Sequence, residues 1–527
     1  MIGARGCARR LGWPGQAPSF ALLLGLRLAN ALLVQTFIHP DETWQSLEVG
    51  HRLAFGYGFV TWEWRHALRG FAHPLLFAGV YRALRVLGLD DTFLITAAPY
   101  VLVAVIAAAV DYATFHFARR VAGHEVARWA LFCSVVSWSM SSGVMRPLVN
   151  SAETAFTAAA FAHWPWSQPQ ARARSGSLPL PLVFAALACI IRPTSGALWL
   201  VAGLVLLVRQ PRPRRISRTI RIVSTAAVIG AAALAAMLAI DYVGYQRWVF
   251  PPYQFYLFNV HEGLATWFGE SPPLYHLYVS LPILFTSMLP FVIHGVYTAF
   301  CTQRVTCEPA VVALGASVLF SLVGHMEYRF LYPLLPIGFV YAAVSINALA
   351  TQKTARLIAL LLLLTNIVPA LYLNLVHQRG VVDVMKHLRQ GARAGDVSDI
   401  GFLMPCHSTP FYSHLHVNIP MWFLSCEPPL TQAALDSHYW EADDFEQHPA
   451  EFLGALFSES AEEASVRVRR SKPSHLVLYA GMAQRIHNVL GDLGYHESAR
   501  FFNTHFAGDS RRQGDVLVYR LSGTQSS

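Results

Sequence analysis

The fold is decided by residues 21–51, ALLLGLRLANALLVQTFIHPDETWQSLEVGH, where an apolar run passes directly into acids, histidines and a tryptophan. Such a run is long enough to cross about 30 Å of hydrocarbon. Of the 527 residues, 54% are hydrophobic and 13% are charged, whereas soluble domains carry about 25% charged residues. The sequence therefore predicts a polytopic membrane protein whose first span opens onto a polar surface segment.

Further apolar stretches of similar length follow along the chain, some of them short or interrupted by proline. We predict about 11 transmembrane helices, at 19–38, 93–118, 126–143, 150–166, 179–192, 194–208, 222–242, 274–300, 310–324, 328–349 and 355–377. The stretch 71–89 is also long enough, but it contains Arg82 and Arg85. We place it at the membrane interface, because another span would invert everything after it. The first span is interpreted as a retained helix, with a cleaved signal peptide as the alternative.

Basic residues are unevenly distributed between the two sets of connections. One set contains mostly arginines and lysines, namely Arg5, Arg9, Arg10, Arg119, Arg120, Arg128, Arg172, Arg174, Arg209, Arg212, Arg214, Arg215, Arg218, Arg221, Arg304, Lys353 and Arg356. The positive-inside rule places this set in the cytosol, with the N-terminus inside and the C-terminus outside. The net charge of +9 follows from these clusters, so it does not indicate a nucleic-acid partner, and no nucleotide-binding motif is present.

After residue 377 charged residues become frequent and apolar runs shrink to strand length. The pieces IGFLMP, SHLVLYAG and GDVLVYRL indicate buried strands, and MAQRIHNVLGDLGY has helical spacing. We therefore predict three parts: a cytosolic N-terminus at 1–18, a transmembrane module at 19–377 with luminal loops 39–72 and 241–273, and a luminal α/β domain at 378–527. An oxidising compartment would permit a disulfide between Cys406 and Cys426, with two free buried thiols as the alternative.

The loop at 39–72 contains the residues best suited to chemistry. Its acids and tryptophans include Asp41, Glu42, Trp44, Glu48, Trp62, Glu63 and Trp64. An acid in the first turn after a span lies where a lipid-linked substrate presents its head group, so Asp41 is a candidate catalytic residue. Trp44 is predicted to be an interfacial anchor. His51 is given no role.

Other polar residues are predicted on the same side of the membrane. VMRPLVNSAET carries Arg146, CIIRPTSG carries Arg192, and HMEYRFLYP carries His325, Glu327 and Arg329. The planar guanidinium suits phosphate oxygens, although each arginine could equally be an interface residue. The loop 241–273 adds aromatic residues with Asn259, His261 and Glu262, groups that suit a sugar.

A carboxylate, several arginines and aromatic loops on one side of the membrane favour a transferase whose donor releases a lipid phosphate. A channel or pump would instead tend to bury several ionisable groups at mid-membrane, whereas only Arg27 clearly lies inside a predicted span here. The competing interpretations are a lipid scramblase or transporter and a non-catalytic assembly subunit.

Residues 39–64, HPDETWQSLEVGHRLAFGYGFVTWEW, resemble the first luminal loop of the dolichyl-phosphate-mannose-dependent mannosyltransferases of the GT-C fold, with its (H/P/A)DE-x-x-Q-x-x-E pattern. HMEYRFLYP is similar to their H-x-E-x-R-F motif, with methionine and tyrosine where HKEERF is common. FLMPCHSTPFYSHLH resembles the branch that acts on the glycosylphosphatidylinositol (GPI) precursor.

This resemblance implies an enzyme of the endoplasmic reticulum that transfers mannose from dolichyl phosphate mannose, with inversion, to the second mannose of the GPI glycolipid precursor. The related enzymes of the lipid-linked N-glycan precursor are the alternative. We expect Asp41 to be the base, with Glu42 the second choice. The donor phosphate would be bound by Arg329, with His325, Arg192 and Arg146 as helpers.

Candidate substrate-binding residues are Gln45, Glu48, Trp62, Glu63, Asn259, His261 and Glu327. No cofactor and no metal are predicted, with a divalent ion on Asp41 and Glu42 as the alternative.

Overall fold

The computed structural model describes residues 17–167, 177–211, 215–432, 438–458 and 469–523. Most of the predicted N-terminal segment 1–18 lies outside these residues, as do Arg172, Arg174, Arg212 and Arg214 of the basic connections. The chain forms two compact units. Unit 1 comprises Met1–Leu33, His66–Leu75 and Pro99–Leu371, and unit 2 comprises Val34–Arg65, Leu76–Ala98 and Tyr372–Ser527.

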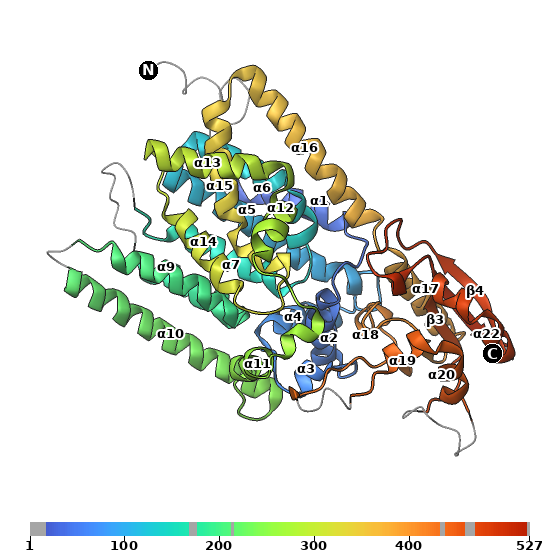
Figure 1. The fold of residues 1–527 in the computed structure, drawn as a ribbon. Helices are drawn as coiled ribbons and strands as arrows, with labels where there is room; N and C mark the ends of the chain where they lie inside the picture. Colours follow the sequence, from blue (N-terminus) through green and yellow to red (C-terminus); the bar gives the residue numbers. More distant parts are fainter. Residues whose placement is uncertain (1–16, 168–176, 212–214, 433–437, 459–468, 524–527) are drawn as a thin grey trace. The chain divides into compact units, whose positions relative to one another are not determined.

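The apolar runs fold into helices close to the predicted spans (Figure 1). Within the described ranges, five helical stretches are long and apolar enough to cross a membrane: Leu94–Ala122, Arg215–Tyr245, His276–Thr302, Tyr328–Leu349 and Gln352–Ala394. Shorter apolar helices lie at Phe20–Leu33, Pro179–Ile191, Pro193–Val208 and Glu308–Phe320. The predicted spans 126–143 and 150–166 correspond to the helices His124–Val136 and Val149–His163. The total of about 11 spans stays a prediction.

Prolines begin several of the unit 1 helices, where the missing N–H has no helical partner to lose. α8, α14 and α15 each carry proline in the first two positions. The helices that lie wholly or largely in this unit are α1 (Phe20–Leu33), α5 (Leu94–Ala122), α6 (His124–Val136), α7 (Val149–His163), α8 (Pro179–Ile191), α9 (Gly196–Val208), α10 (Arg215–Tyr245), α11 (Pro251–Tyr256), α12 (Leu281–Phe285), α13 (Leu289–Thr302), α14 (Glu308–Phe320), α15 (Leu335–Leu349) and α16 (Gln352–Leu375).

The arginine within the first predicted span has a buried acidic partner in unit 1. Arg27 of α1 donates from Nε and Nη2 to the two carboxylate oxygens of Asp111 of α5, at 2.7 and 2.8 Å. The side chains are 3% and 1% exposed. Ser134 adds a 2.6 Å hydrogen bond to Asp111. The buried guanidinium is therefore neutralised by a carboxylate, as a low-dielectric interior requires.

Unit 2 contains a five-stranded mixed sheet of order β2-β1-β3-β5-β4. Its strands are β1 (Ile400–Phe402), β2 (Met421–Phe423), β3 (His475–Tyr479), β4 (Tyr495–Phe501) and β5 (Val516–Leu521). β1 pairs in parallel with β2 and β3, whereas β5 is antiparallel to β3 and β4. The predicted strands in IGFLMP, SHLVLYAG and GDVLVYRL are confirmed, and the predicted helix is present as two short helices.

The helices of unit 2 are α2 (Glu48–Phe55), α3 (Trp62–Arg65), most of α4 (Ala72–Val86), α17 (Gly380–Ala394), α18 (Tyr412–Leu415), α19 (Glu441–Gln447), α20 (Pro449–Leu456), α21 (Ala480–Arg485) and α22 (His487–Asp492). Residues of α17 and α18 belong to a buried cluster on one face of the sheet, and residues of α20, α21 and α22 belong to a cluster on the other. Alternate residues of β3 belong to different clusters: Val477 and Tyr479 to one, Leu476 and Leu478 to the other. This is the period-two alternation of a sheet buried on both faces.

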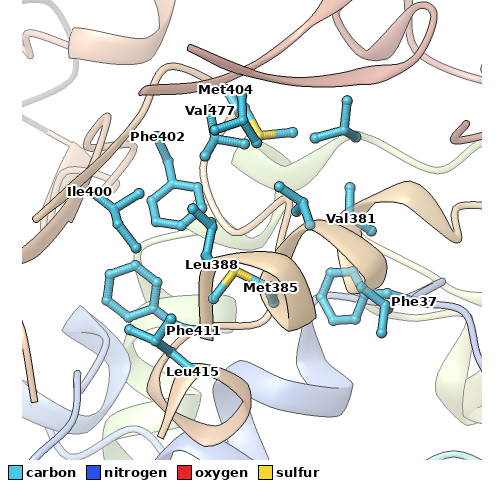
Figure 2. Close-up of a cluster of buried hydrophobic side chains, with 14 of the residues drawn as sticks. Phe37, Val381, Met385, Leu388, Ile400, Phe402, Met404, Phe411, Leu415 and Val477 are labelled. Atoms are coloured by element: carbon cyan, nitrogen blue, oxygen red, sulfur yellow. The ribbon is translucent and has the colours of Figure 1, made fainter. Parts of the chain in front are cut away.

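One of these clusters joins chain segments that are far apart in sequence. Figure 2 shows Phe37 beside Val381 and Met385 of α17, with Ile400 and Phe402 of β1 in the same cluster. Trp44 belongs to this cluster as well. The loop after the first predicted span therefore packs within the same unit as the chain after residue 377, which the sequence predicted to be a separate domain at 378–527.

Candidate active site

A tight turn places the two candidate bases at the start of a helix. One carboxylate oxygen of Glu42 accepts hydrogen bonds from the backbone N–H groups of Ile38 and His39, at 3.1 and 2.7 Å. The backbone N–H of Trp44 donates to Pro40 at 3.0 Å and begins the helical turn. Glu42 is 1% exposed, whereas Asp41 is partly exposed. The turn thus uses Glu42 as a structural acceptor and presents Asp41 to the solvent side.

Trp44 was predicted to anchor the loop at the membrane interface, and that prediction is wrong. Its side chain is 3% exposed, and its indole N–H donates to the carbonyl oxygen of Thr409 at 3.0 Å. The rings of Phe411 and Phe423 lie 5.2 and 5.1 Å from the indole. Trp44 is therefore a buried core residue of unit 2.

Glu48 was predicted to bind substrate, but it is 0% exposed. Its Oε1 atom accepts hydrogen bonds from the backbone N–H groups of Phe411 and Ser413, at 3.2 and 2.8 Å. Burial raises the pKa of Glu48 to about 7, although the hydrogen bonds from Ser413 and Phe411 act in the opposite direction. A carboxylate in this position holds the 411–413 segment and cannot contact a substrate.

The remaining candidates of this loop lie close to each other. The side-chain amide of Gln45 contacts both carboxylate oxygens of Glu63, at 3.4 and 3.5 Å. Both residues are partly exposed, so the pair can reach a substrate. Trp62 is 6% exposed and Trp64 3%, which leaves little of either ring for stacking on a sugar.

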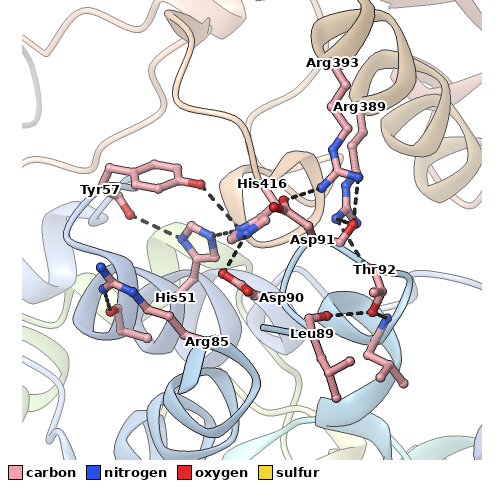
Figure 3. Close-up of polar contacts among 12 residues, drawn as sticks. His51, Tyr57, Arg85, Leu89, Asp90, Asp91, Thr92, Arg389, Arg393 and His416 are labelled. Carbon is pink, nitrogen blue, oxygen red and sulfur yellow. Dashed lines mark hydrogen bonds and ion pairs between the residues drawn. The ribbon is translucent and has the colours of Figure 1, made fainter. Parts of the chain in front are cut away.

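His51, which was given no role, belongs to a buried polar network (Figure 3). Its Nε2 atom lies 2.9 Å from Nδ1 of His416, and its Nδ1 atom lies 3.3 Å from the carbonyl oxygen of Tyr57. Asp90 approaches Nε2 of His416 at 3.8 Å. Burial lowers the pKa of His51 to about 3, so the ring is neutral at ordinary pH and serves to connect three chain segments of unit 2.

The two cysteines of the C-terminal region are joined in a disulfide, with Cα atoms 6.0 Å apart. His407 follows the first of them, and its ring lies 4.3 Å from the indole of Trp44. Among the described residues, Cys406, His407 and Cys426 are the group whose ligand atoms lie near enough to hold a metal, within 4.8 Å of one another. Because the two sulfur atoms are bonded to each other, this group does not fit a metal ion.

In unit 1 the predicted phosphate-binding motif is an ion-pair cluster. Arg329 donates from Nε and Nη2 to the two oxygens of Glu327, at 2.6 and 2.5 Å. The Nε2 atom of His325 lies 3.6 Å from the same carboxylate, and its Nδ1 atom lies 2.8 Å from the carbonyl oxygen of Gly269. The hydrogen bond to Glu327 raises the pKa of His325. The i, i+2, i+4 spacing thus brings all three side chains together.

The other two candidate arginines have different surroundings. Arg192 pairs with the buried Glu153 at 3.1 Å, and its guanidinium lies 4.7 Å over the ring of Phe330. It is therefore next to the residue that follows Arg329. Arg146 lies in the connection before α7, where a span boundary was predicted, but it is 0% exposed and donates from Nε to the carbonyl oxygen of Ser142 at 3.1 Å. Its role in binding the donor phosphate stays a prediction.

The candidate sugar-binding residues of the loop 241–273 have local contacts. The side-chain amide of Asn259 donates to the carbonyl oxygen of Phe255, four residues earlier in the same helical stretch, at 2.9 Å. His261 pairs with its neighbour Glu262 at 3.2 Å and is 64% exposed at the side chain. Neither contact selects a sugar, and the role of these residues stays a prediction.

Sequence reasoning missed three residues that the structure connects to the candidates. Glu153 lies in the quoted motif VMRPLVNSAET, within the predicted span 150–166, yet its pairing with Arg192 has no local signal. His407 and His416 lie in FLMPCHSTPFYSHLH, where two histidines flank the Glu48-binding segment. The high histidine content of that stretch was the feature of the sequence that could have pointed to these residues.

The chain matches the model of the Alg9-like mannosyltransferase family over residues 19–416. It is 40% identical to GPI mannosyltransferase 3 of Yarrowia lipolytica over 507 residues, covering 95% of this chain and 96% of that protein. It is 35% identical to GPI alpha-1,2-mannosyltransferase 3 of Homo sapiens, covering 94% of this chain and 85% of the human protein.

Solved structures with similar folds share little sequence with this chain. The ArnT crystal structure from Cupriavidus metallidurans bound to undecaprenyl phosphate has a TM-score of 0.58 at 12% identity, covering 96% of this chain and 97% of ArnT. The oligosaccharyltransferase of Archaeoglobus fulgidus in the apo form has a TM-score of 0.50 at 11% identity, with coverage of 94% and 76%. Both have the GT-C fold, and the predicted fold class is thereby confirmed.

Proposed function

This chain belongs to the Alg9-like mannosyltransferase family, and we propose from that premise that it adds the third mannose, in α1,2 linkage, to the GPI-anchor precursor. It is a multi-pass membrane glycosyltransferase, and enzymes of this family use lipid-linked sugar donors and glycolipid acceptors. The observation that carries the acceptor assignment is the 40% identity to a GPI mannosyltransferase 3 over nearly the full length of both proteins.

The proposed donor is dolichyl phosphate β-D-mannose, and the proposed compartment is the endoplasmic reticulum. The asymmetry of basic residues supports a cytosolic N-terminus, with the catalytic loop and the C-terminal region in the lumen. An epitope tag after Ser527 should be inaccessible to antibody when only the plasma membrane is permeabilised. Labelling under that condition would reverse the orientation.

We assign the base to Asp41. Its carboxylate would accept the proton of the acceptor 2-hydroxyl while that oxygen attacks the anomeric carbon of mannose. The bond from that carbon to the phosphate oxygen breaks with its electron pair, and dolichyl phosphate leaves with inversion. The turn geometry supports Asp41 over Glu42, because Glu42 is 1% exposed and one of its oxygens already accepts two backbone hydrogen bonds.

The donor phosphate is assigned to the Arg329 cluster of unit 1. Glu327 fixes the plane of the Arg329 guanidinium through two hydrogen bonds, and His325 lies on the same carboxylate. A guanidinium with fixed orientation presents parallel donors to phosphate oxygens without reorganising in the transition state. Arg192 over Phe330 is the nearest candidate helper, and Gln45 with Glu63 is the candidate contact to the acceptor sugar.

The decisive experiment is mannose transfer by purified Asp41→Asn protein, with Asp492→Asn as a matched exposed control. We expect Asp41→Asn to lose about 10²- to 10⁴-fold in kcat and the control to keep normal turnover. Normal turnover by Asp41→Asn would remove the assignment of the base. Transfer is expected to continue in EDTA, and activity that is lost in EDTA and restored by magnesium or manganese would overturn metal-free catalysis.

The acceptor is tested separately in cells that lack this enzyme. Mass spectrometry of their GPI intermediates should show a two-mannose species that disappears on re-expression of the protein. Normal GPI intermediates together with truncated N-glycan precursors would assign the enzyme to the N-glycan pathway instead.

A further inference from the structure

We propose that the aromatic loop, residues 502–508 with the sequence FNTHFAG, inserts into the surface of the lipid bilayer beside the end of α16. The loop follows β4 and belongs to unit 2. A lipid contact at this position is independent of which residues act as the base and which bind the donor phosphate.

The aromatic loop exposes two large apolar side chains. Phe502 is 47% exposed and Phe506 is 71% exposed. The ring of His505 lies 4.8 Å from the ring of Phe502 and 6.4 Å from the ring of Phe506, so the three rings form one patch. The sequence between Arg500 and Asp509 contains no acidic residue, lysine or arginine. An exposed apolar patch without charge indicates contact with a partner of low polarity.

The aromatic loop contacts the end of α16 through side chains of unit 2. The hydroxyl oxygen of Tyr372 lies 3.3 Å from Nδ1 of His505, and its ring lies 6.1 Å from the ring of Phe506. Just after the helix, Nδ1 of His377 lies 2.8 Å from the hydroxyl oxygen of Thr504. The exposed rings are therefore held next to the last turn of α16.

The backbone of the aromatic loop is fixed as well. The backbone N–H of Arg379 donates to the carbonyl oxygen of Asn503 at 3.2 Å. At Gly380 a Cβ atom would lie 2.8 Å from the carbonyl oxygen of Phe502, so only glycine permits this close approach of the two backbones. These contacts hold the loop against the segment that connects α16 to α17.

Tyr372 marks the level of the bilayer surface. α16 runs from Gln352 to Leu375, and it begins a stretch that is long and apolar enough to cross a membrane. A rise of about 1.5 Å per residue places Tyr372 about 28 Å from Lys353, which is close to the hydrocarbon thickness of about 30 Å. Val368 lies one helical turn before Tyr372 on the same face, and it is 61% exposed. This face of α16 therefore meets lipid, and Tyr372 lies where interfacial aromatic residues are enriched.

The neighbouring rings of the aromatic loop share this level, because Phe506 and His505 contact Tyr372 directly. Interfacial segments bury their aromatic side chains about 5–10 Å into the boundary between head groups and acyl chains. A second protein chain bound here would first have to displace the lipid around the end of α16. The bilayer is therefore the occupant that the structure favours.

The test replaces Phe506 with p-benzoylphenylalanine, which has a similar shape and forms covalent adducts with nearby C–H groups on irradiation. Val368 of α16, replaced in the same way, is the control for lipid contact. Glu451, at an exposed position of α20, is the control for a surface in water. Each full-length protein is checked by size-exclusion chromatography, reconstituted in phosphatidylcholine nanodiscs and irradiated, and mass spectrometry measures the fraction of protein that carries a lipid adduct. The irradiation is repeated in isolated cell membranes.

We expect the fraction with a lipid adduct at Phe506 to exceed that at Glu451 by about fivefold or more, and to lie within about threefold of that at Val368. A fraction at Phe506 equal to that at Glu451 overturns the proposal. Adducts at Phe506 that are mainly to protein in cell membranes also overturn it, because they assign the loop to an interface with a partner or with a second copy of this chain.

Discussion

The carboxylate of Glu48 accepts a 2.8 Å hydrogen bond from the backbone N–H of Ser413, which lies 365 residues further along the chain. A second hydrogen bond comes from Phe411 at 3.2 Å. These two bonds fix the segment between His407 and His416 to the helix that follows the candidate base. An acid in the loop motif thus has a structural role in unit 2, and its removal has measurable consequences.

Replacement of Glu48 by alanine should destabilise the protein by about 2 to 4 kcal/mol, because two buried N–H groups lose their acceptor. Glu48→Gln keeps one acceptor oxygen and should cost less than about 1 kcal/mol. The measurement is the temperature at which half of the detergent-purified protein survives size-exclusion chromatography after heating. Glu451→Gln, at an exposed position of α20, is the control. Equal midpoints for Glu48→Ala and wild type would contradict the structural role.

The raised pKa of Glu48 should make the stability of the folded protein depend on pH. Its pKa is about 7 in the folded protein and 4.5 without the fold. Between these values the unfolded chain has lost the proton while the folded protein keeps it, so the contribution of Glu48 falls as the pH rises. The change from pH 4.5 to 7 is about 3 kcal/mol. The difference in midpoint between wild type and Glu48→Gln should therefore shift in favour of the variant as the pH rises, and a constant difference would contradict it.

Loss of the disulfide should weaken unit 2. The bridged cysteines are 20 residues apart in sequence, and a loop of that size contributes about 3 kcal/mol in the chain-entropy account. The double variant Cys406→Ser/Cys426→Ser should unfold at a lower temperature than wild type under non-reducing conditions. Cys301→Ser, at an exposed free cysteine, is the matched control. Equal midpoints for the double variant and the control would show that the disulfide contributes nothing.

The buried pair in unit 1 should respond asymmetrically to single and double substitution. Arg27→Met leaves Asp111 buried without its partner and should cost about 3 to 5 kcal/mol. Arg27→Met/Asp111→Leu removes both charges and should recover most of that loss. The heated size-exclusion midpoints of the two variants and wild type form the test. A double variant no more stable than Arg27→Met would contradict the prediction that the unpaired charge of Asp111 causes the loss.

Much of the helical fold could be predicted from composition, because a membrane helix needs a long apolar run and little else. The strands at Ile400–Phe402, His475–Tyr479 and Val516–Leu521 were also predictable from short apolar runs. β4 (Tyr495–Phe501) was missed, because its burial is one-sided and its sequence, YHESARF, is mostly polar.

The candidate site was less predictable, because its parts meet only through tertiary contacts. The spacing of His325, Glu327 and Arg329 places them together within one short segment, and sequence reasoning grouped them. Trp44 was misjudged because its cover comes from Thr409, Phe411 and Phe423. The sequence near residue 44 contains no pattern that predicts contacts with residues so distant in the chain.

Unit 2 is completed only when the last part of the chain has been made. Trp44 and Glu48 are synthesised early, and their partners at Thr409 and Ser413 follow some 365 residues later. At about 5 to 20 residues per second the interval is on the order of tens of seconds. During translation, Trp44 in the loop that carries the candidate base therefore stays exposed until its partners have been synthesised. A chain truncated before residue 409 lacks these partners, so its first loop cannot bury Trp44.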